Sequence, residues 1–372
     1  MSLAAAARVG DAVAAIATPA LVIDLDALER NIARMAAYAR EHGMRLRPHA
    51  KTHKCAEIAK RQIAAGAVGV CVQKLSEAQA LAEAGVADLY ISNEVVDAGK
   101  LAELAALAAR ARLAIAVDSG LGVDRLAAAL KAAGTSVDVF VEVDVGHGRC
   151  GVAPAAAASL AHQVVSHGLR FAGLQAYHGR AQHLRTPAER ESAIRHAVSL
   201  ARAAQASVTS AGIACPLVTG AGTGTFVLEA ASGLYGELQA GSYVFMDRDY
   251  ADNHAAPHAP VFEHALFVKS QVMSAGTSHV VVDAGHKSHA IDSGLPRVHG
   301  RELEFVNGGD EHGILRKHGA APLPALGETV WLIPGHCDPT VNLHEHYVVV
   351  RGGLEAGRVE AIWPIDARGC IR

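Results

Sequence analysis

Short apolar runs alternate with longer amphipathic segments over the first two thirds of the chain, and this alternation limits the possible folds more than any other feature. The runs are apolar at nearly every position, as in parallel strands buried on both faces. Helices are predicted between them, for example at Ser76–Ala84, Gly99–Arg110, Ala155–His167 and Ala188–Ala211. The predicted strands are Met44–His49, Ala67–Val72, Leu89–Ser92, Leu113–Val117, Val137–Val143, Phe171–Ala176, Pro216–Thr219 and Ala240–Phe245. Eight strand–helix units in about 200 residues predict a closed (β/α)8 barrel of the TIM type, within the α/β class.

The pattern changes after residue 255, where short β-branched runs are separated by Gly and Pro with no long helical period between them. These runs predict a mainly antiparallel β domain. An early run, Ala20–Asp24, precedes a helix-like segment, Leu25–Glu41, and we expect this strand to pair with the C-terminal strands. The predicted division is a barrel over 25–250 and a β domain made of 1–24 and 251–372. The C-terminal runs are Ala265–Val272, His279–Val282, Thr329–Ile333, His346–Val350 and Val359–Trp363.

Composition excludes several classes of partner. The formal net charge is −3 and aromatic residues make up 4% of the chain, so binding to nucleic acid or to an anionic membrane is not expected. No uncharged apolar stretch of about 18 residues is present to span a membrane. The start of the chain lacks the basic segment of a signal peptide, and Arg8 and Asp11 interrupt its apolar run. The six cysteines form no CxxC pair, which indicates reduced thiols and a cytoplasmic location.

Polar residues follow the predicted barrel strands repeatedly, at the end where the active sites of such barrels lie. Lys51 follows the first strand and is surrounded by His49, His53 and Lys54. Burial and neighbouring positive charge are expected to lower the pKa of its amine, as a lysine that forms a Schiff base requires. The alternative is a solvated lysine on a basic loop.

Glycines follow the seventh predicted strand, in the segment 219–225. Backbone N–H groups of such a loop, placed before a helix, can bind a phosphate group. Barrels often hold phosphate with the loops after strands seven and eight, and the eighth predicted strand carries three further candidates. A plain glycine-rich turn is the alternative interpretation. The candidate phosphate-binding residues are Gly220, Gly222, Thr223, Gly224, Gly241, Ser242 and Tyr243.

Three other residues at the same rim are candidates to contact a cofactor. Gln73 follows the second strand, Arg149 follows a glycine turn after the fifth, and Tyr177 follows the sixth. A structural ion pair is one interpretation of Arg149, but at this rim it is better interpreted as a fixed cation that faces the ring oxygen of a cofactor or a substrate carboxylate. Tyr177 and the adjacent His178 are candidates to pack on the cofactor or to exchange protons, or are ordinary half-buried residues.

His336 and Asp338 are candidate metal ligands in the C-terminal part. The two residues are two positions apart, so on an extended segment their side chains are expected to point the same way. Cys337 between them is expected to point away. An imidazole and a carboxylate suit Mn²⁺, Mg²⁺ or Zn²⁺ with other positions open. With 21 histidines in the chain, a chance pairing on a solvent loop is the alternative.

Several motifs taken together resemble the D-threonine aldolase family and its relatives, the 3-hydroxy-D-aspartate aldolases and dehydratases and the D-serine dehydratases. The resemblance extends from about Thr18 to the C-terminus. The motifs are Pro48-His49-Ala50-Lys51-Thr52-His53-Lys54, Glu142-Val143-Asp144-Val145-Gly146-His147-Gly148-Arg149-Cys150-Gly151, Gly173-Leu174-Gln175-Ala176-Tyr177-His178-Gly179 and His336-Cys337-Asp338-Pro339-Thr340-Val341-Asn342-Leu343.

This resemblance implies the fold-type III arrangement of alanine racemase, in which a pyridoxal 5′-phosphate barrel carries a β domain, usually in a homodimer. It implies that Lys51 is the Schiff-base lysine, that His336 and Asp338 bind the metal, and that Asp310 lies near the substrate. D-serine dehydratases carry a cysteine at the position that resembles Asp338, so the aspartate favours the aldolase branch.

The expected reaction is cleavage of a D-3-hydroxy amino acid, such as D-threonine or 3-hydroxy-D-aspartate, to glycine and an aldehyde. The metal lowers the pKa of the 3-hydroxyl group, and water or His183 acts as the base. A dehydratase would use the same groups with Lys51 as the base, and a non-catalytic protein of pyridoxal phosphate homeostasis would lack the β domain. A racemase would not need the metal pair. The cationic segment Ala284–His289, with His286 and His289, is expected to help hold a second substrate carboxylate, which would favour 3-hydroxyaspartate over threonine. A solvated turn is the equal alternative.

Overall fold

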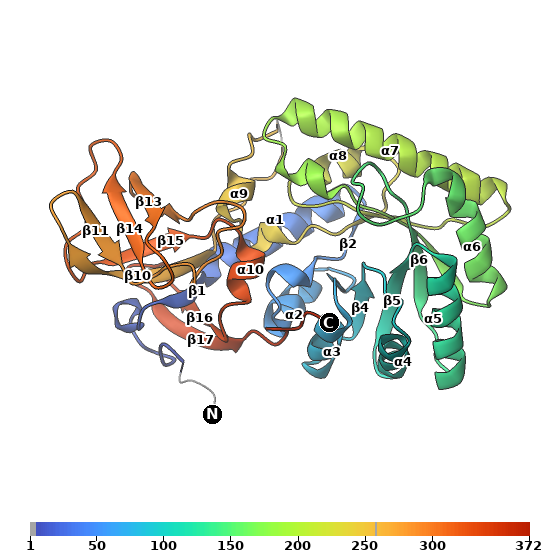
Figure 1. Cartoon of the computed structure of the whole chain (residues 1–372), viewed down its shortest axis with the longest axis horizontal. Helices are drawn as coiled ribbons and strands as arrows, with labels where there is room; N and C mark the ends of the chain where they lie inside the picture. The colour runs from blue at the N-terminus through green and yellow to red at the C-terminus, as the bar shows by residue number, and fades with distance from the viewer. Residues whose placement is uncertain (1–4, 257–258) are drawn as a thin grey trace.

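Eight parallel strands form the barrel of the computed structural model, which describes residues 5–256 and 259–372 (Figure 1). Neighbouring strands follow the order β2-β9-β8-β7-β6-β5-β4-β3, and a bridge between His49 and Cys71 joins the end of β2 to β3 and closes the ring. The closed barrel predicted from the sequence is therefore confirmed. The strands are β2 (Arg45–Leu46), β3 (Val70–Val72), β4 (Asp88–Ile91), β5 (Arg112–Val117), β6 (Asp138–Glu142), β7 (Arg170–Ala176), β8 (Val218–Gly220) and β9 (Glu237–Leu238).

Helices connect successive strands and cover the outside of the barrel (Figure 1). Their starts follow ordinary capping chemistry: Asp24 caps α1, Asp97 caps α4, and Thr186 with Glu189 forms a capping box on α7. The four helices predicted by range are confirmed to within a few residues. The helices are α1 (Leu25–Glu41), α2 (Ala56–Ala64), α3 (Leu75–Glu83), α4 (Ala98–Leu107), α5 (Gly120–Ala133), α6 (Ala157–Ser166), α7 (Pro187–Ser210), α8 (Phe226–Ala231), α9 (Arg248–Ala251) and α10 (Cys337–Val341).

The prediction of the eighth strand is wrong. The strand is β9, at Glu237–Leu238, whereas the predicted range Ala240–Phe245 contains a short 3-10 helix, η5 (Ser242–Val244). Glu237 lies inside the barrel, where its carboxylate accepts a hydrogen bond from the Arg47 guanidinium at 3.3 Å. Because β9 carries a buried charge, it lacks the run of apolar residues by which buried strands are predicted. The segment Ala240–Phe245 has such a run for another reason, since it packs into the core shared with the C-terminal sheet.

The second sheet is mainly antiparallel and lies beside the barrel (Figure 1). The early strand β1 pairs antiparallel with β10 and parallel with β16, as the sequence predicts. Three strands, β12 to β14, escaped sequence prediction because they are short and carry charged residues on one face. The strands are β1 (Ala20–Asp24), β10 (Leu266–Ala275), β11 (His279–Val282), β12 (Arg297–Val298), β13 (Leu303–Asn307), β14 (Gly313–Lys317), β15 (Thr329–Ile333), β16 (His346–Arg351) and β17 (Arg358–Pro364).

The two sheets share one apolar core, which contains side chains of α1, of the segment after β9 and of strands β10, β15 and β16. Asn31 of α1 is fully buried there. Its side chain donates to the carbonyl groups of Val244 and Glu263 at 3.2 and 2.8 Å, and it accepts from the Glu263 N–H at 2.9 Å. These bonds connect α1 to the chain that leaves the barrel for the second sheet. The predicted domain boundaries, at residues 24 and 250, stay a prediction.

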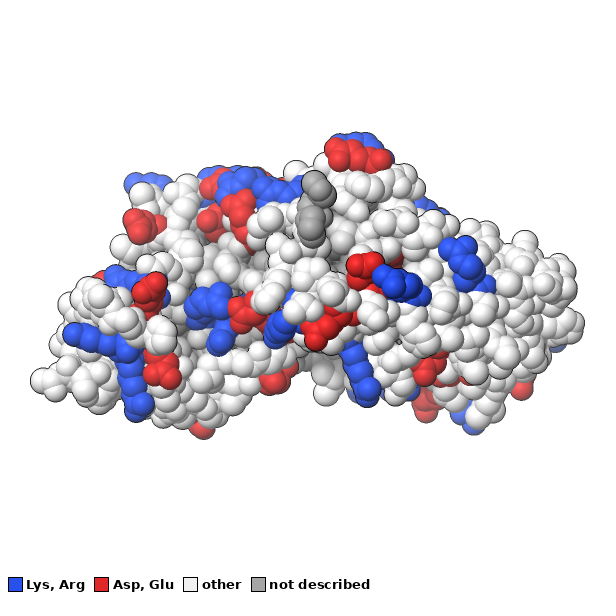
Figure 2. Space-filling view, turned by 90° about the horizontal axis from the view of Figure 1, so that it is seen from above, with Lys and Arg blue, Asp and Glu red and all other residues white. Residues whose placement is uncertain are grey.

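Surface features agree with the composition. On the face shown in Figure 2, basic and acidic side chains are interspersed. Within 5–256 and 259–372, no helix has the length and apolar character needed to cross a bilayer. The six cysteines, all in the described residues, are free. Residues 1–4, which are predicted to belong to the β domain, lie outside the described residues.

Candidate active site

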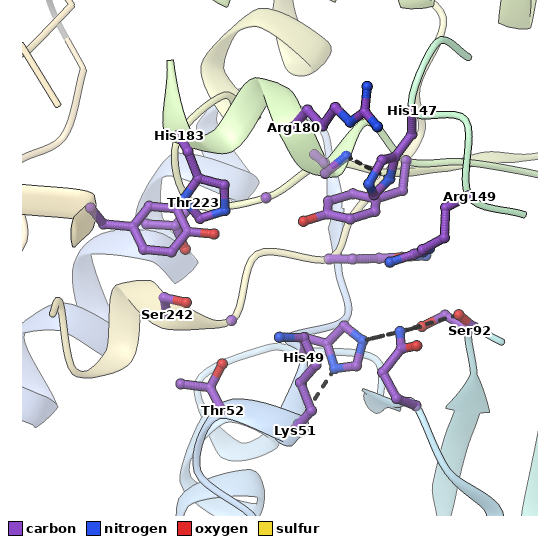
Figure 3. Close-up of a pocket in the computed structure, with 18 of the residues that line it drawn as sticks. His49, Lys51, Thr52, Ser92, His147, Arg149, Arg180, His183, Thr223 and Ser242 are labelled. Atoms are coloured by element: carbon purple, nitrogen blue, oxygen red, sulfur yellow. Dashed lines mark hydrogen bonds between the residues drawn. The ribbon is translucent and has the colours of Figure 1, made fainter. Parts of the chain in front are cut away.

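A cavity of about 350 Å³ lies at the carboxyl ends of the barrel strands. Figure 3 shows Lys51, His49 and Thr52 on one wall and His147, Arg180 and His183 on the opposite wall. Thr223 and Ser242 lie at one end, and Arg149 lies at the other. The lining residues are His49, Lys51, Thr52, Gln73, Ser92, His147, Arg149, Gln175, Tyr177, Gly179, Arg180, His183, Ala221, Gly222, Thr223, Gln239, Gly241, Ser242 and Tyr250.

Lys51 lies in a 3-10 turn, η2 (Ala50–Thr52), that directly follows the first barrel strand. Its Nζ is ion-paired with Asp338 of α10, so the barrel and the C-terminal part of the chain meet at this amine. Burial favours the neutral amine, but the Asp338 carboxylate outweighs it and raises the pKa of Lys51 above its ordinary value. The predicted lowering of this pKa is therefore wrong, because Asp338, far away in the chain, lies beside Lys51.

His49 forms the floor of the cavity beside Lys51. Its Nε2 lies 3.0 Å from Gln73 Nε2 and 3.2 Å from Ser92 Oγ. Burial and the nearby Lys51 charge hold the pKa of His49 well below its ordinary value, so the imidazole is neutral. Gln73, predicted as a cofactor contact, thus reaches the cavity and also fixes the orientation of His49.

The glycine loop after β8 presents backbone donors to the cavity. Among the described residues, the N–H groups of Gly222 and Thr223 have no protein acceptor. A Cβ at Gly222 would collide with Gln182, and a Cβ at Gly241 would lie 2.8 Å from the His49 carbonyl oxygen, so both positions require glycine. Free N–H groups in a loop that leads into a helix are an arrangement that binds an anionic group such as phosphate.

A buried polar network beneath this loop holds it in place. Gln182 Oε1 accepts from the Gly224 N–H at 3.0 Å, and its Nε2 donates to Thr225 Oγ1 at 2.8 Å. The Thr225 hydroxyl donates in turn to Glu229 Oε1 at 2.8 Å. Glu229 is only 1% exposed, and burial raises its pKa to about 7. Gly224 therefore supports the loop from below and does not line the cavity.

Arg149 and Tyr177 lie together at the opposite end of the cavity. The Arg149 guanidinium carbon lies 5.8 Å from the centre of the Tyr177 ring, within the range of a cation–π contact. His147 lies edge-on to the same ring, with the two ring centres 6.3 Å apart. This end of the cavity therefore combines a fixed cation with an aromatic face, as the candidate cofactor contacts require.

His336 and Asp338 lie next to the cavity, with His336 Nε2 3.9 Å from Asp338 Oδ1. The predicted geometry is wrong in one respect: Asp338 lies in the first turn of α10 with His336 as its N-cap, not on an extended segment. Cys337 between them is fully buried, and its orientation away from the pair stays a prediction. Asp292 accepts from His336 Nδ1 at 2.7 Å, and the buried Asp338 Oδ1 has no hydrogen-bond partner among the described residues. The unbonded Asp338 oxygen and the His336 imidazole, which Asp292 holds in place, are together suitable ligands for a divalent cation.

His183 lines the cavity from η4 (Gly179–His183), and its Nδ1 lies 2.5 Å from Asp249 Oδ2. Burial alone would raise the pKa of Asp249, but hydrogen bonds from His183 and Arg185 lower it, so the carboxylate is charged. A histidine whose Nδ1 proton is held by a carboxylate has its Nε2 available to accept a proton.

Asp310 does not line the cavity. It lies in the turn between β13 and β14, where its carboxylate pairs with His286 at 2.8 Å. The expectation that His289 binds a substrate carboxylate is wrong, because this side chain is fully buried against Phe305, and burial lowers its pKa to about 4. His286 is already engaged by Asp310.

Several residues that line the cavity were not predicted from the sequence, and some predicted cofactor contacts do not line it. Ser92, Gln175, Gln239 and Tyr250 carry no signal beyond their position near strand ends. The Tyr243 side chain points into the core, where its hydroxyl accepts from Gln62, and only its N–H reaches Thr223 Oγ1 at 3.0 Å. Gly220 belongs to β8 itself. Sequence reasoning also missed Asp249 and Asp292, which orient His183 and His336, and Asp247, which accepts from the Cys337 N–H between the two candidate metal ligands.

Comparison with known proteins agrees with this arrangement. The family model described as "Alanine racemase, N-terminal domain" matches residues 23–249, and the "Putative serine dehydratase domain" matches residues 265–350. The chain is 47% identical to a D-threonine aldolase from Arthrobacter sp. (98% of this chain, 96% of the relative). It is 42% identical to a 3-hydroxy-D-aspartate aldolase from Paracoccus denitrificans (95% and 92%). The crystal structure of D-threonine aldolase from Filomicrobium marinum superposes with a TM-score of 0.96 at 47% identity, with both chains fully covered.

The fold and the site thus define an enzyme of the alanine racemase-like barrel class, with a second, mainly antiparallel sheet that completes the site. Within that class, the chain belongs to the family of lyases that contains the D-threonine aldolases and the 3-hydroxy-D-aspartate aldolases.

Glu229 gives the fold a defined pH dependence. Its pKa is higher in the folded chain, at about 7, than the ordinary 4.5. The folded state therefore binds the proton more tightly, and stability falls as pH rises from about 4.5 to 7. Replacing this carboxyl in Glu229→Gln removes the penalty. The stability of the variant relative to wild type should rise by about 2–3 kcal/mol between pH 5 and pH 8, measured by urea unfolding. A difference that does not change with pH would contradict this account, and the exposed Lys131→Ala serves as the control.

Proposed function

We propose that the protein is an aldolase that cleaves D-3-hydroxy amino acids to glycine and an aldehyde, using pyridoxal 5′-phosphate and a divalent metal. The observation that carries this proposal is the contact between Lys51 and Asp338. In this contact the Lys51 amine, which would carry the cofactor, lies beside Asp338, one of the two candidate metal ligands. Cleavage next to a hydroxyl group can use these two functions together, an electron sink at Cα and a cation that acidifies the hydroxyl group.

The cavity residues fit pyridoxal phosphate. The free N–H groups of Gly222 and Thr223, with the Ser242 hydroxyl, would hold the phosphate, and Lys51 would bind the aldehyde carbon. Arg149 and Tyr177, at the far end, would contact the ring. When bound, the cofactor supplies an electron sink for the pair released by the broken bond.

The protein groups around the 3-hydroxyl have separate tasks. His336 and Asp338 would hold a divalent cation, which lowers the pKa of a hydroxyl group that it contacts. His183, oriented by Asp249, would accept the hydroxyl proton at Nε2. Loss of that proton and cleavage of the Cα–Cβ bond give the aldehyde, and protonation at Cα gives glycine. Asp310 is retained as a candidate near the substrate, and Mn²⁺ or Mg²⁺ is proposed as the metal, with Zn²⁺ as an alternative.

Basic residues in the cavity favour a substrate with a second carboxylate. Arg180 has no ion-pair partner among the described residues and lines the cavity with His147. A carboxylate side chain, as in 3-hydroxy-D-aspartate, would neutralise this charge, whereas the methyl group of D-threonine would not. Both remain substrates in this proposal. We also propose that the enzyme is a cytoplasmic homodimer.

A dehydratase is the second candidate, because residues 265–350 match a family model described as a serine dehydratase domain. In that reaction Lys51 would take the Cα proton and the cation would assist departure of hydroxide. The aspartate at position 338 supports the aldolase proposal instead, because the resembling dehydratases carry a cysteine there. The two reactions differ in their products, glycine with an aldehyde against a 2-oxo acid with ammonia.

Lys51→Ala tests the cofactor assignment. The variant should lose the visible absorbance of protein-bound pyridoxal phosphate and should retain none of the lyase activity above background, because no other amine is predicted to bond the cofactor. Absorbance spectra after dialysis against pyridoxal phosphate provide the measurement. Lys74→Ala is the matched control, since Lys74 follows the second strand but is exposed and should leave the band unchanged. A visible band retained in Lys51→Ala would refute the assignment.

Metal removal separates the roles of cation and cofactor. Treatment of the holoenzyme with EDTA should abolish formation of glycine from D-threonine and from 3-hydroxy-D-aspartate while the visible band persists. Addition of Mn²⁺ should restore activity. His336→Ala should remain inactive after this addition, since the cation has lost an imidazole ligand. Chromatographic assay of glycine, aldehyde, 2-oxo acid and ammonia gives the readout. Full activity in EDTA, or oxo acid without glycine, would contradict the proposed function.

A further inference from the structure

Two glutamine side chains form a hydrogen-bonded amide pair where the barrel interior meets the cavity. Gln175 lies at the end of β7, and Gln239 follows β9. Gln239 Nε2 donates to Gln175 Oε1 at 2.8 Å, and Gln175 Nε2 donates to Gln239 Oε1 at 3.2 Å. Both side chains line the cavity, although they are only 2% and 4% exposed. Neither has a task in the proposed cleavage.

A buried ion pair inside the barrel fixes the orientation of both amides. Glu237 is paired with Arg47, so its carboxylate only accepts hydrogen bonds. The Thr219 hydroxyl therefore donates to Glu237 Oε1 at 3.0 Å, and its oxygen accepts from Gln239 Nε2 at 2.8 Å. The Gln239 nitrogen is thus directed toward Thr219 and Gln175, which in turn fixes the orientation of the Gln175 amide.

One amide hydrogen of this pair is left over. Both hydrogens of Gln239 Nε2 are used, one by Thr219 and one by Gln175. Gln175 Oε1 also accepts from the Tyr90 hydroxyl at 2.9 Å, whereas Gln175 Nε2 has a single acceptor among the described residues. A buried N–H without an acceptor is costly. Because Gln175 is almost fully buried, that acceptor can come only from a group that enters the cavity.

The cavity offers this N–H no negatively charged neighbour. None of the described residues that line it is an aspartate or a glutamate. Glu142 is the register partner of Gln175 on β6 but does not line the cavity. Burial and the Glu94 charge raise the pKa of Glu142 to about 9, so this carboxyl group is uncharged at neutral pH.

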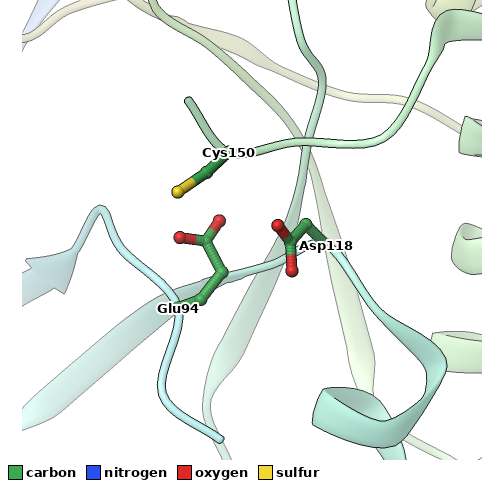
Figure 4. A group of neighbouring side chains, drawn as sticks. All are labelled: Glu94, Asp118 and Cys150. Carbon is green, nitrogen blue, oxygen red and sulfur yellow. The ribbon is translucent and has the colours of Figure 1, made fainter. Parts of the chain in front are cut away.

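Other carboxylates of the barrel rim lie outside the cavity lining. Glu94 and Asp118 converge with Cys150 on another part of the rim (Figure 4). Asp338 contacts the cavity only through its ion pair with Lys51. A cationic nitrogen beside the amide pair would therefore have no carboxylate partner, whereas a neutral nitrogen acceptor would match the remaining N–H.

The amide pair lies across the barrel from Lys51. β7 is three strands from β2 in the closed ring of eight. Gln175 is two residues before Tyr177, whose side chain also lines the cavity. In pyridoxal phosphate the ring nitrogen lies opposite the carbon that carries the aldehyde group. A cofactor held at Lys51 therefore directs this nitrogen away from that lysine.

We propose that the amide pair Gln175–Gln239 receives the ring nitrogen of pyridoxal phosphate, and that the remaining Gln175 N–H donates to it. This inference rests on the proposed binding of that cofactor. A nitrogen whose lone pair accepts from an amide stays unprotonated, and it withdraws electrons less strongly than a pyridinium. Glu237 and Arg47 thereby set the polarity of the site without placing a charge in the cavity.

Nitrogen NMR tests this inference with a readout other than activity. The full-length protein is loaded with pyridoxal phosphate that carries ¹⁵N at the ring nitrogen. The wild type should give the resonance of an unprotonated, hydrogen-bonded pyridine nitrogen at neutral and at mildly acidic pH. A pyridinium resonance at neutral pH would overturn the inference and leave the proposed function in place. A protein that does not bind the labelled cofactor would refute both.

Two variants of the same network identify the donor. In Gln175→Leu the ring nitrogen has lost its donor, so its resonance should move toward that of a pyridinium at mildly acidic pH. Tyr90→Phe is the matched control, because it removes a hydrogen bond to the same amide at a side chain that does not line the cavity. It should keep the wild-type resonance. An unchanged resonance in Gln175→Leu would contradict the inference, and the wild-type spectrum decides it if this variant does not fold.

Discussion

The ion pair between Lys51 and Asp338 is the contact on which the organisation of this enzyme depends. Lys51 follows the first barrel strand and Asp338 begins α10, nearly 290 residues later. Burial would favour the neutral forms of both groups, but each charge stabilises the other, and Lys51 lowers the pKa of Asp338. The pair requires the barrel and the second sheet to be held in one fixed arrangement. β1, which pairs with β10 and β16, and α1, which packs into the shared core, provide that arrangement.

The barrel rim has two parts with different chemistry. Loops after β2, β8 and β9 carry the amine and the free N–H groups that suit an aldehyde and a phosphate. Loops after β4, β5 and β6 carry carboxylates and a thiol. Arg149 lies between them, because it lines the cavity while its guanidinium faces Glu142. The guanidinium of Arg149 is therefore close to both parts of the rim.

Much of the fold and part of the site could be predicted from the sequence. Continuous apolar runs indicate strands that are buried on both faces, and they predict most of the barrel. Lys51, Arg149 and the glycine loop could be predicted as site residues because they follow the ends of these strands. The eighth strand could not be found this way, because Glu237 is charged and becomes acceptable inside the barrel only through Arg47. The raised pKa of Lys51 depends on Asp338, a partner far away in the chain. His289 looked like an exposed cation but is enclosed by Phe305 and the surrounding sheet. These three errors came from contacts between separate segments of the chain, which local patterns do not encode.

The account makes Lys51 the residue that carries the cofactor, and covalent trapping tests this most directly. The protein loaded with pyridoxal phosphate is reduced with sodium borohydride, which fixes the cofactor to the amine that holds it, and is then digested and examined by mass spectrometry. The account predicts the reduced cofactor on Lys51, with Lys54 and Lys74 unlabelled. Label on Lys54 or Lys74 in place of Lys51, or no label on this segment, would contradict it.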